Sequence, residues 1–170
     1  MRTKRVIVVQ YDYKWNDEFQ KIKSYLEKAL KNSIVAIEHV GSTSIEGLYA
    51  KPIIDIDVVI KNYDNFHEVK SNLEKLRYYH EGDLGIKDRE AFGYIEKHEF
   101  MTHQLYVCPQ NSKELERHIA FRDYLKTHKE YREKYSEIKL QASKKYPTDI
   151  NSYIEFKSPF IAEIYKKIGL

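Results

Sequence analysis

The chain has 170 residues, of which 42% are hydrophobic and 14% aromatic, and its 29 basic and 26 acidic side chains leave a net charge of +3. This length predicts one domain, and the hydrophobic content supplies a packed core, which argues against an intrinsically disordered chain. So small a net charge lacks the strong positive field of a dedicated DNA-binding protein, although it allows an anionic substrate.

Cysteine content and hydropathy bear on the compartment. Cys108 is the single cysteine, so an internal disulfide is impossible and a reducing compartment fits. The apolar run Val6–Val9 is too short for a secretory signal, and no apolar run reaches the length of a membrane span. We therefore expect a cytoplasmic protein without a membrane partner.

The first part of the chain alternates between strand and helix patterns. β-Branched runs predict strands, and apolar residues spaced three and four apart predict helices. In chain order, the predicted elements are a strand at Val6–Val9, a helix at Asp17–Lys31 capped by Asn16, strands at Ile34–Val40 and Ile53–Ile60, a helix at Asn65–Leu76, a loop or irregular strand over Tyr78–Asp88, and a hairpin of Ala91–Ile95 with Phe100–Cys108. Pro109 is expected to end the last strand.

From Ser112 onward the pattern is helical. Ser112 is expected to cap a helix at Lys113–Thr127, a charged helix follows at His128–Tyr146 up to Pro147, and Ile150–Ile168 forms the last helix. The whole order predicts an α+β fold with one mixed sheet. We expect an α/β core over residues 1–110 and a helical extension over 111–170 packed on it as a single unit.

Two carboxylates, Asp55 and Asp57, interrupt the apolar run of the strand Ile53–Ile60. Residues i and i+2 of a strand share a face, so both carboxylates point to one side while Ile54 and Ile56 point to the core. Neighbouring carboxylates repel one another unless a cation lies between them. Mg²⁺ accepts one or two carboxylates and completes its shell with water and phosphate oxygens, so the pair predicts a Mg²⁺ site. The alternative is a strand face that is merely solvated.

A small polar turn, Gly41-Ser42-Thr43-Ser44, precedes this strand. Glycine allows close approach of a ligand, and free backbone N–H groups together with the Ser42 and Ser44 hydroxyls suit a phosphate. A β-rich segment, the Gly-Ser turn and the acidic strand follow one another in the chain. Together they predict a phosphate site beside a metal site at one end of a small sheet.

This order of motifs resembles the nucleotidyltransferase superfamily, and the detailed sequence resembles the GrpB family of nucleotidyltransferase-like proteins. The matching pieces are Tyr11, Trp15, "EHVGSTSIEGL", "AKPIIDIDV", "THQLYVC", "RHIAFRDYL" and the closing residues Tyr153, Lys157, Phe160 and Ile161. The resemblance implies attack on the α-phosphate of a nucleoside triphosphate, with Mg²⁺ on Asp55 and Asp57 and with Ser42 on the β- and γ-phosphates. The acceptor, whether small molecule, protein or RNA, is left open.

The chain departs from the superfamily pattern at the third carboxylate, which a later strand should supply. The candidate strand "FMTHQLYVC" contains no acid, and we expect His103 to take that place as a general base or a phosphate ligand. Glu96 and Glu99 would reach the site only if the hairpin turn folded back. Nucleotide and Mg²⁺ binding is therefore favoured over transfer, and the alternative is a non-catalytic nucleotide-sensing or protein-binding module. Glu46 also replaces the proline usual in the family, with an effect only on the stiffness of the turn.

Several basic residues are candidates for phosphate or acceptor contacts. We expect Lys51, before the acidic strand, and Arg122 and Lys157, within the matching pieces, to bind nucleotide, whereas Arg117 and Lys139 suit a solvated helix face. An RNA-associated factor is a weaker option. A zinc site on His98, His103 and Cys108 is disfavoured, since the two histidines are five residues apart on a predicted strand rather than four apart on a helix.

Overall fold

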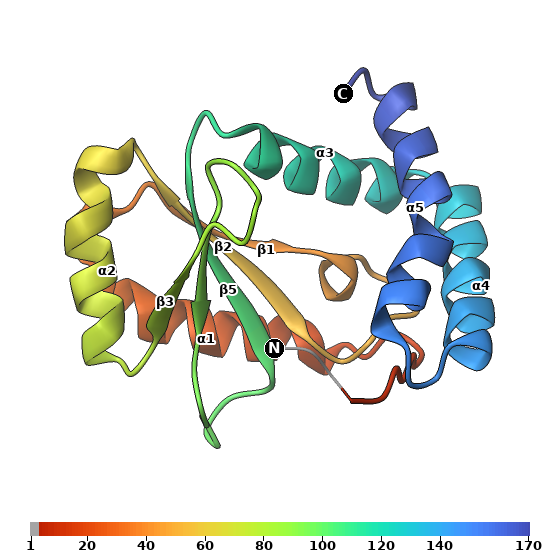
Figure 1. Ribbon diagram of the computed structural model, residues 1–170, viewed down its shortest axis with the longest axis horizontal. Coiled ribbons are helices and arrows are strands. Elements are labelled where there is room, and N and C mark those ends of the chain that lie inside the picture. Colours follow the sequence, from red (N-terminus) through yellow and green to blue (C-terminus); the bar gives the residue numbers. More distant parts are fainter. Residues whose placement is uncertain (1–3) are drawn as a thin grey trace.

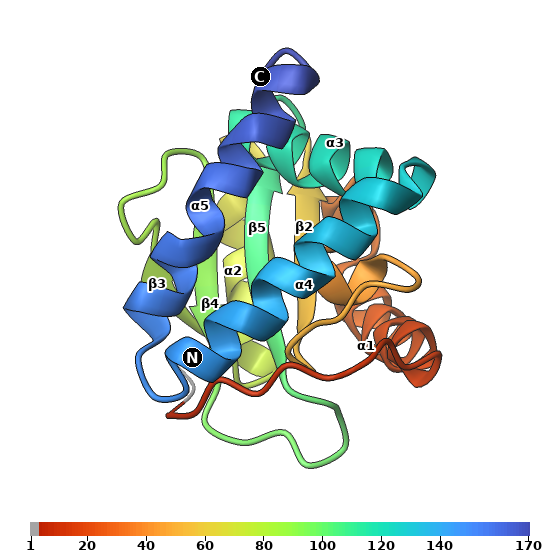
Figure 2. The same cartoon turned by 90° about the vertical axis from the view of Figure 1, so that its right-hand side faces the viewer.

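The structure is a computed structural model that describes residues 4–170 and shows a five-stranded mixed sheet with helices on both faces (Figures 1 and 2). The strands are β1 (Ala36–Val40), β2 (Ile54–Ile60), β3 (Tyr79–Gly82), β4 (Glu90–Gly93) and β5 (His103–Pro109), in the spatial order β1-β2-β5-β4-β3. β2 and β5 run parallel, and the other neighbouring pairs are antiparallel. The predicted α+β fold with one mixed sheet is confirmed.

Helices α1 (Lys14–Leu30) and α2 (Phe66–Lys75) cover one face of the sheet. The buried stripe of α1 recurs at helical spacing and packs against the core side of β2, which consists of Ile54, Ile56, Val58 and Ile60. Full burial of one such aliphatic side chain is worth roughly 1.5–3 kcal/mol, so this layer is the main source of stability. It fixes which face of β2 is left to carry Asp55 and Asp57.

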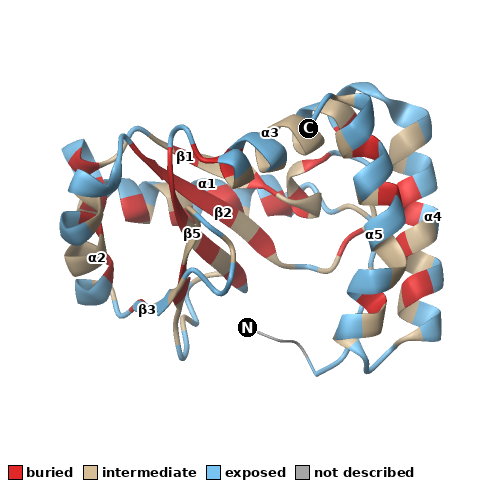
Figure 3. Cartoon of the chain, turned by 45° about the horizontal axis from the view of Figure 1, so that its top comes forward, coloured by how far each residue is buried: buried red, intermediate tan, exposed pale blue. Residues whose placement is uncertain are grey.

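The opposite face lies against α3 (Lys113–Thr127), α4 (Lys129–Lys145) and α5 (Ile150–Lys167). Ser112 caps α3 by accepting a hydrogen bond from the Leu115 N–H at 3.0 Å, as predicted. A second core joins these helices to the turn after β1, and its buried members are Ile45, Leu48, Leu125, Tyr135, Phe160 and Ile164. Buried residues accordingly alternate with exposed ones along α4 and α5 (Figure 3). The C-terminal helices therefore hold the polar turn against the sheet.

Two local predictions need correction. Val6–Val9 is not a strand of the sheet, because its backbone bonds only isolated groups: the Val6 N–H donates to Pro147 O at 2.8 Å, and Val9 forms a bridge with Ala50. Asn16 does not cap α1, which already begins at Lys14, where Asp12 accepts the backbone N–H at 2.9 Å. The prediction of loop or irregular strand over Tyr78–Asp88 agrees with the structure, where the short strand β3 pairs with β4 with a shift in register between His80 and Gly82.

No helix within residues 4–170 combines the length and the hydropathy that a membrane span needs.

Candidate functional site

The two carboxylates lie on the central strand β2, on the face that the C-terminal helices cover. Asp57 is fully buried and Asp55 is partly exposed. In the register of the sheet, Asp55 has Val40 on one side and Gln104 on the other, and Asp57 lies opposite both Glu38 and Tyr106. Period-two alternation thus puts both carboxylates on one face, as predicted.

Gly41 brings the end of β1 directly over Asp55. Its φ of +71° lies in a region that favours glycine, and a Cβ at this position would stand 2.8 Å from the Asp55 Cγ and overlap the carboxylate. A glycine is therefore required here for two reasons, the backbone conformation and the space that the carboxylate fills.

The three hydroxyl groups of the turn after Gly41 have different surroundings. Thr43 is buried and donates to Ile53 O at 3.1 Å, and the Ser44 hydroxyl donates to Gly41 O at 2.5 Å. Both hydroxyls hold the shape of the turn. Ser42, in contrast, lines a cavity together with Asp55. Of the predicted phosphate-binding hydroxyls, the structure therefore brings only that of Ser42 to the carboxylate.

Three lysines converge on this cavity, which has a volume of about 290 Å³. Lys51, Lys139 and Lys157 line it with Ser42 and Asp55. Lys139 is only 2% exposed; it contacts the Ser42 hydroxyl and donates to Tyr49 O at 3.2 Å. The expected solvated position of Lys139 is wrong, because α4 packs the side of the helix that carries Lys139 onto the turn.

The lysines of this cavity are crowded and form no ion pairs among the described residues. Within residues 4–170, none of the three lysines has a carboxylate within salt-bridge distance. Burial lowers the pKa of Lys157 to about 8, with the nearby Lys51 cation adding to the effect, and burial lowers the pKa of Lys139 well below its ordinary value. Burial also raises the pKa of Asp55 to about 6. The three crowded amines face one carboxylate, and an anion bound among them would stabilise their protonated forms.

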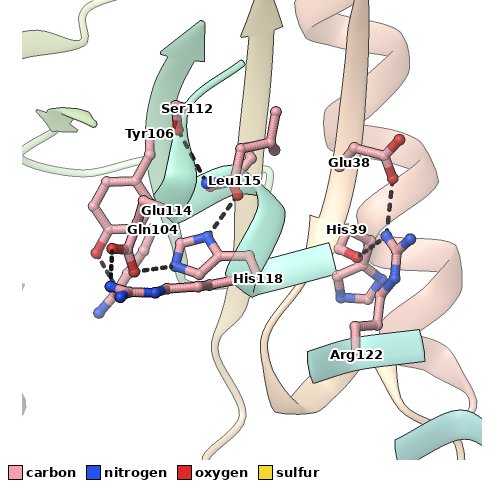
Figure 4. A network of polar contacts seen from close by, with 11 residues as sticks. Glu38, His39, Gln104, Tyr106, Ser112, Glu114, Leu115, His118 and Arg122 are labelled. Carbon is pink, nitrogen blue, oxygen red and sulfur yellow. Dashed lines mark hydrogen bonds and ion pairs between the residues drawn. The ribbon is translucent and has the colours of Figure 1, made fainter. Parts of the chain in front are cut away.

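A histidine from α3 holds the second carboxylate. His118 Nδ1 donates to Asp57 Oδ2 at 2.6 Å. Its Nε2 lies 3.2 Å from Glu114 Oε1, one turn earlier in the same helix (Figure 4). Burial lowers the pKa of His118, but the hydrogen bonds to Asp57 and Glu114 outweigh it and raise the pKa to about 10. The contact between His118 and Asp57 is not predicted from the sequence, whose only local signal is the spacing of Glu114 and His118 by one helical turn.

The other oxygen of Asp57 has no partner. Oδ1 is buried and makes no hydrogen bond to any residue in the described part of the chain. A buried carboxylate oxygen without a partner is costly, so this atom is suited to a cation. No group of three or more histidine, cysteine, aspartate or glutamate side chains that could hold a metal occurs within residues 4–170. Asp55 and Asp57 thus fit an ion such as Mg²⁺ that takes its remaining ligands from water and phosphate.

The structure does not place His103 beside the carboxylates. His103 pairs with Ile54 in the register of β2 and β5, so it points to the opposite face, where its Nε2 lies 2.7 Å from the Tyr78 hydroxyl. The expectation that His103 occupies the position of the third carboxylate is therefore wrong by one residue, because adjacent residues of a strand point to opposite faces of the sheet. Gln104 lies there instead. Glu96 and Glu99 are exposed in the loop that leads to β5.

Arg122 is not part of the lysine cavity either. Its guanidinium donates to Glu38 Oε2 at 2.9 Å and to His39 O at 3.0 Å, beside β1 (Figure 4). Arg122 thus joins α3 to the edge strand of the sheet, and the expected nucleotide contact has no support from its position. Cys108 is buried between Val59 and Leu115, where burial raises its pKa, as for a packed, unreactive thiol.

Solved structures show the same fold. The crystal structure of conserved protein GrpB from Enterococcus faecalis has a TM-score of 0.83 and 30% sequence identity, with 95% of this chain and 96% of that chain covered. Cid1 poly(U) polymerase with MgGTP bound has a TM-score of 0.55 at 11% identity, with 79% of this chain and 43% of that chain covered. The second likeness shows the fold alone, which is nucleotidyltransferase-like.

Sequence comparisons agree. Glutamate-rich protein GrpB of Alkalihalophilus pseudofirmus is 34% identical over 168 residues, which span 96% of this chain and 95% of that protein. UPF0157 protein YqkA of Bacillus subtilis is 32% identical over 160 residues, although the matched part spans only 46% of YqkA. The family model of the GrpB protein matches residues 5–167. The chain therefore belongs to the GrpB family.

Proposed function

We propose that the protein binds a nucleoside triphosphate with Mg²⁺ in the lysine cavity and transfers the nucleotidyl group to an acceptor. The observation that carries this proposal is the convergence of Lys51, Lys139 and Lys157 on Ser42 and Asp55 in one cavity.

The phosphate part of the ligand would stabilise the protonated lysines of the cavity. Lys139 is nearly inaccessible and lacks a carboxylate partner within the described residues, so its ammonium form is costly without a ligand. A phosphate beside Ser42 would accept charge-assisted hydrogen bonds from Lys139 and the serine hydroxyl. Lys51 and Lys157 lie at the same cavity and would contribute in the same way.

Asp55 and Asp57 would hold the metal. Both lie on one face of β2, and Asp57 Oδ1 is the buried oxygen without a partner. His118 holds Oδ2 of Asp57 and so leaves Oδ1 to the ion. When bound, Mg²⁺ neutralises charge on phosphate oxygens. The crystal structure of Cid1 with MgGTP, which shares the fold, is consistent with this proposal.

Transfer requires an acceptor hydroxyl in line with the bond to be broken. The acceptor oxygen bonds to the α-phosphorus, the bond from that phosphorus to pyrophosphate breaks, and the acceptor proton is released to solvent. The protein residues orient the triphosphate through Ser42 and the lysines.

Calorimetric titration with ATP, GTP, CTP and UTP, each with and without Mg²⁺, tests the binding step. We expect the wild type to bind at least one of them, and Lys139→Met to weaken this affinity more than about tenfold through loss of a charged hydrogen bond. Lys144→Met is the matched control, because Lys144 is an exposed lysine of the same helix. Absence of binding by the wild type, or equal affinity of Lys139→Met, contradicts the proposal.

A second candidate function is nucleotide sensing without catalysis. It is favoured by one observation, namely that Gln104 and Tyr106, not an acid, lie beside Asp55 and Asp57 on β5. Release of pyrophosphate from the bound nucleotide in the presence of cell extract separates the two functions. Binding without any release, in extracts that support the assay with an active nucleotidyltransferase, identifies the sensor.

A further inference from the structure

Strand β5 presents an amide, Gln104, at the position where a third carboxylate was expected. Gln104 lies opposite Asp55 in the parallel register of β2 and β5, and it lines the lysine cavity. It also borders a smaller cavity of about 120 Å³ that includes Tyr79 and Leu84. Gln104 thus lies between the lysine cavity and this second, smaller cavity.

The amide of Gln104 has a hydrogen-bond partner two residues along the same strand. The Tyr106 hydroxyl donates to Gln104 Oε1 at 3.0 Å (Figure 4). Burial, assisted by the nearby Asp55 carboxylate, raises the pKa of Tyr106 to about 12, so the hydroxyl keeps its proton and remains a donor at neutral pH. The Arg89 guanidinium lies over the Tyr106 ring at 4.3 Å from its centre and restrains it.

The amide nitrogen is the group that remains available. Oε1 accepts from Tyr106, and neither N–H of Nε2 donates a hydrogen bond to another group within residues 4–170. A carboxylate at this place would add negative charge and recruit a further cation, whereas an amide donor suits an anion directly.

We propose that Gln104 binds the nucleotide itself, by donating from Nε2 to an oxygen of the phosphate nearest Asp55, in the place where a third metal-binding carboxylate would otherwise lie. This inference rests on the proposed nucleotide site and adds to it a neutral hydrogen-bond donor in place of a third carboxylate. The phosphate is then held by lysine and amide donors from the protein, and the metal depends on Asp55 and Asp57 alone.

The test uses inorganic tripolyphosphate, which carries the phosphates without a base, in calorimetric titrations of the full chain with Mg²⁺ and with EDTA. Loss of a hydrogen bond to a charged group in Gln104→Ala should weaken binding about tenfold in both conditions. Gln104→Glu has the same shape but adds a negative charge; it should weaken binding by more than about tenfold in EDTA, and Mg²⁺ should restore much of the loss. The ratio of the affinity with Mg²⁺ to the affinity with EDTA should therefore be larger in Gln104→Glu than in the wild type, and unchanged in Gln104→Ala.

Gln110→Ala and Gln110→Glu are the matched controls, because Gln110 is exposed just after the same strand. Thermal melting checks the fold of each variant, and the isosteric Gln104→Glu keeps the test valid if the alanine variant does not fold. Affinities of both Gln104 variants within about threefold of wild type in EDTA would overturn the inference while leaving the nucleotide site intact. A wild type that binds no tripolyphosphate and no nucleoside triphosphate refutes the proposed function itself, and this inference with it.

Discussion

Gly41→Ala should damage the protein more than an alanine at any open glycine of the chain. The backbone at Gly41 has φ 71° and ψ −174°, a region that is essentially restricted to glycine and costs other residues about 1–3 kcal/mol. In addition, the new Cβ would overlap the carboxylate of Asp55 and stand 2.9 Å from its Cβ. Asp55 would have to leave its rotamer or β2 would have to shift, which adds about 1 kcal/mol or more.

Gly85→Ala is the matched control, because Gly85 also has a positive φ, of +81°, but nothing lies within 4 Å of its would-be Cβ. This control should lose only about 1–2 kcal/mol through backbone strain. We expect Gly41→Ala to lose about 2 kcal/mol more than the control in urea unfolding, a further fall in Tm of roughly 4–8 °C for a chain of this size. Tripolyphosphate binding in the presence of Mg²⁺ should be lost in Gly41→Ala only. Equal stabilities of the two variants, together with normal Mg²⁺-dependent binding by Gly41→Ala, would refute the contact between Gly41 and Asp55.

The remaining predictions concern charge. Burial, with help from Lys126 and Arg122, lowers the pKa of His39 to about 4. The folded state therefore binds fewer protons than the unfolded chain between about pH 6.5 and 4, and the free energy of unfolding should fall by up to about 3 kcal/mol as the pH drops through this window. In a series of urea unfolding experiments, the free energy of unfolding should depend less steeply on pH in His39→Gln than in the wild type. Lys157, with its pKa lowered to about 8, must be protonated to bind a phosphate, so the affinity for tripolyphosphate should fall up to about tenfold from pH 8 to 9. The same fall in affinity in Lys157→Met would contradict the role of Lys157 in binding phosphate. His118→Ala removes the partner of the fully buried Asp57 and should cost about 3 kcal/mol in urea unfolding, whereas a loss below about 1 kcal/mol would show that the pair is not what stabilises Asp57.

Local patterns predicted most elements of the fold, because each rests on spacing within a short segment. The apolar repeat of α1, the serine cap of α3 and the alternation in β2 can all be read from neighbouring residues. The prediction of a strand at Val6–Val9 is wrong because a strand depends on contacts outside its own segment. A β-branched run becomes a strand only where a partner strand is available, and the partners of this segment are isolated loop groups from other parts of the chain.

The sequence by itself determined that a small polar Gly-Ser turn and two carboxylates on one strand face occur close together in the chain. Only the tertiary structure decided what surrounds them. Lys139 and His118 lie on separate helices and meet Ser42 and Asp57 because those helices pack on the acidic face of the sheet. The register of β2 and β5 likewise places Gln104, not His103, beside Asp55. Successive residues of a strand point to opposite faces, and the pairing between strands distant in sequence sets which residues are neighbours. Spacing within a segment fixes the face of a side chain, but packing between segments fixes its neighbours, and the chemistry of this site depends on those neighbours.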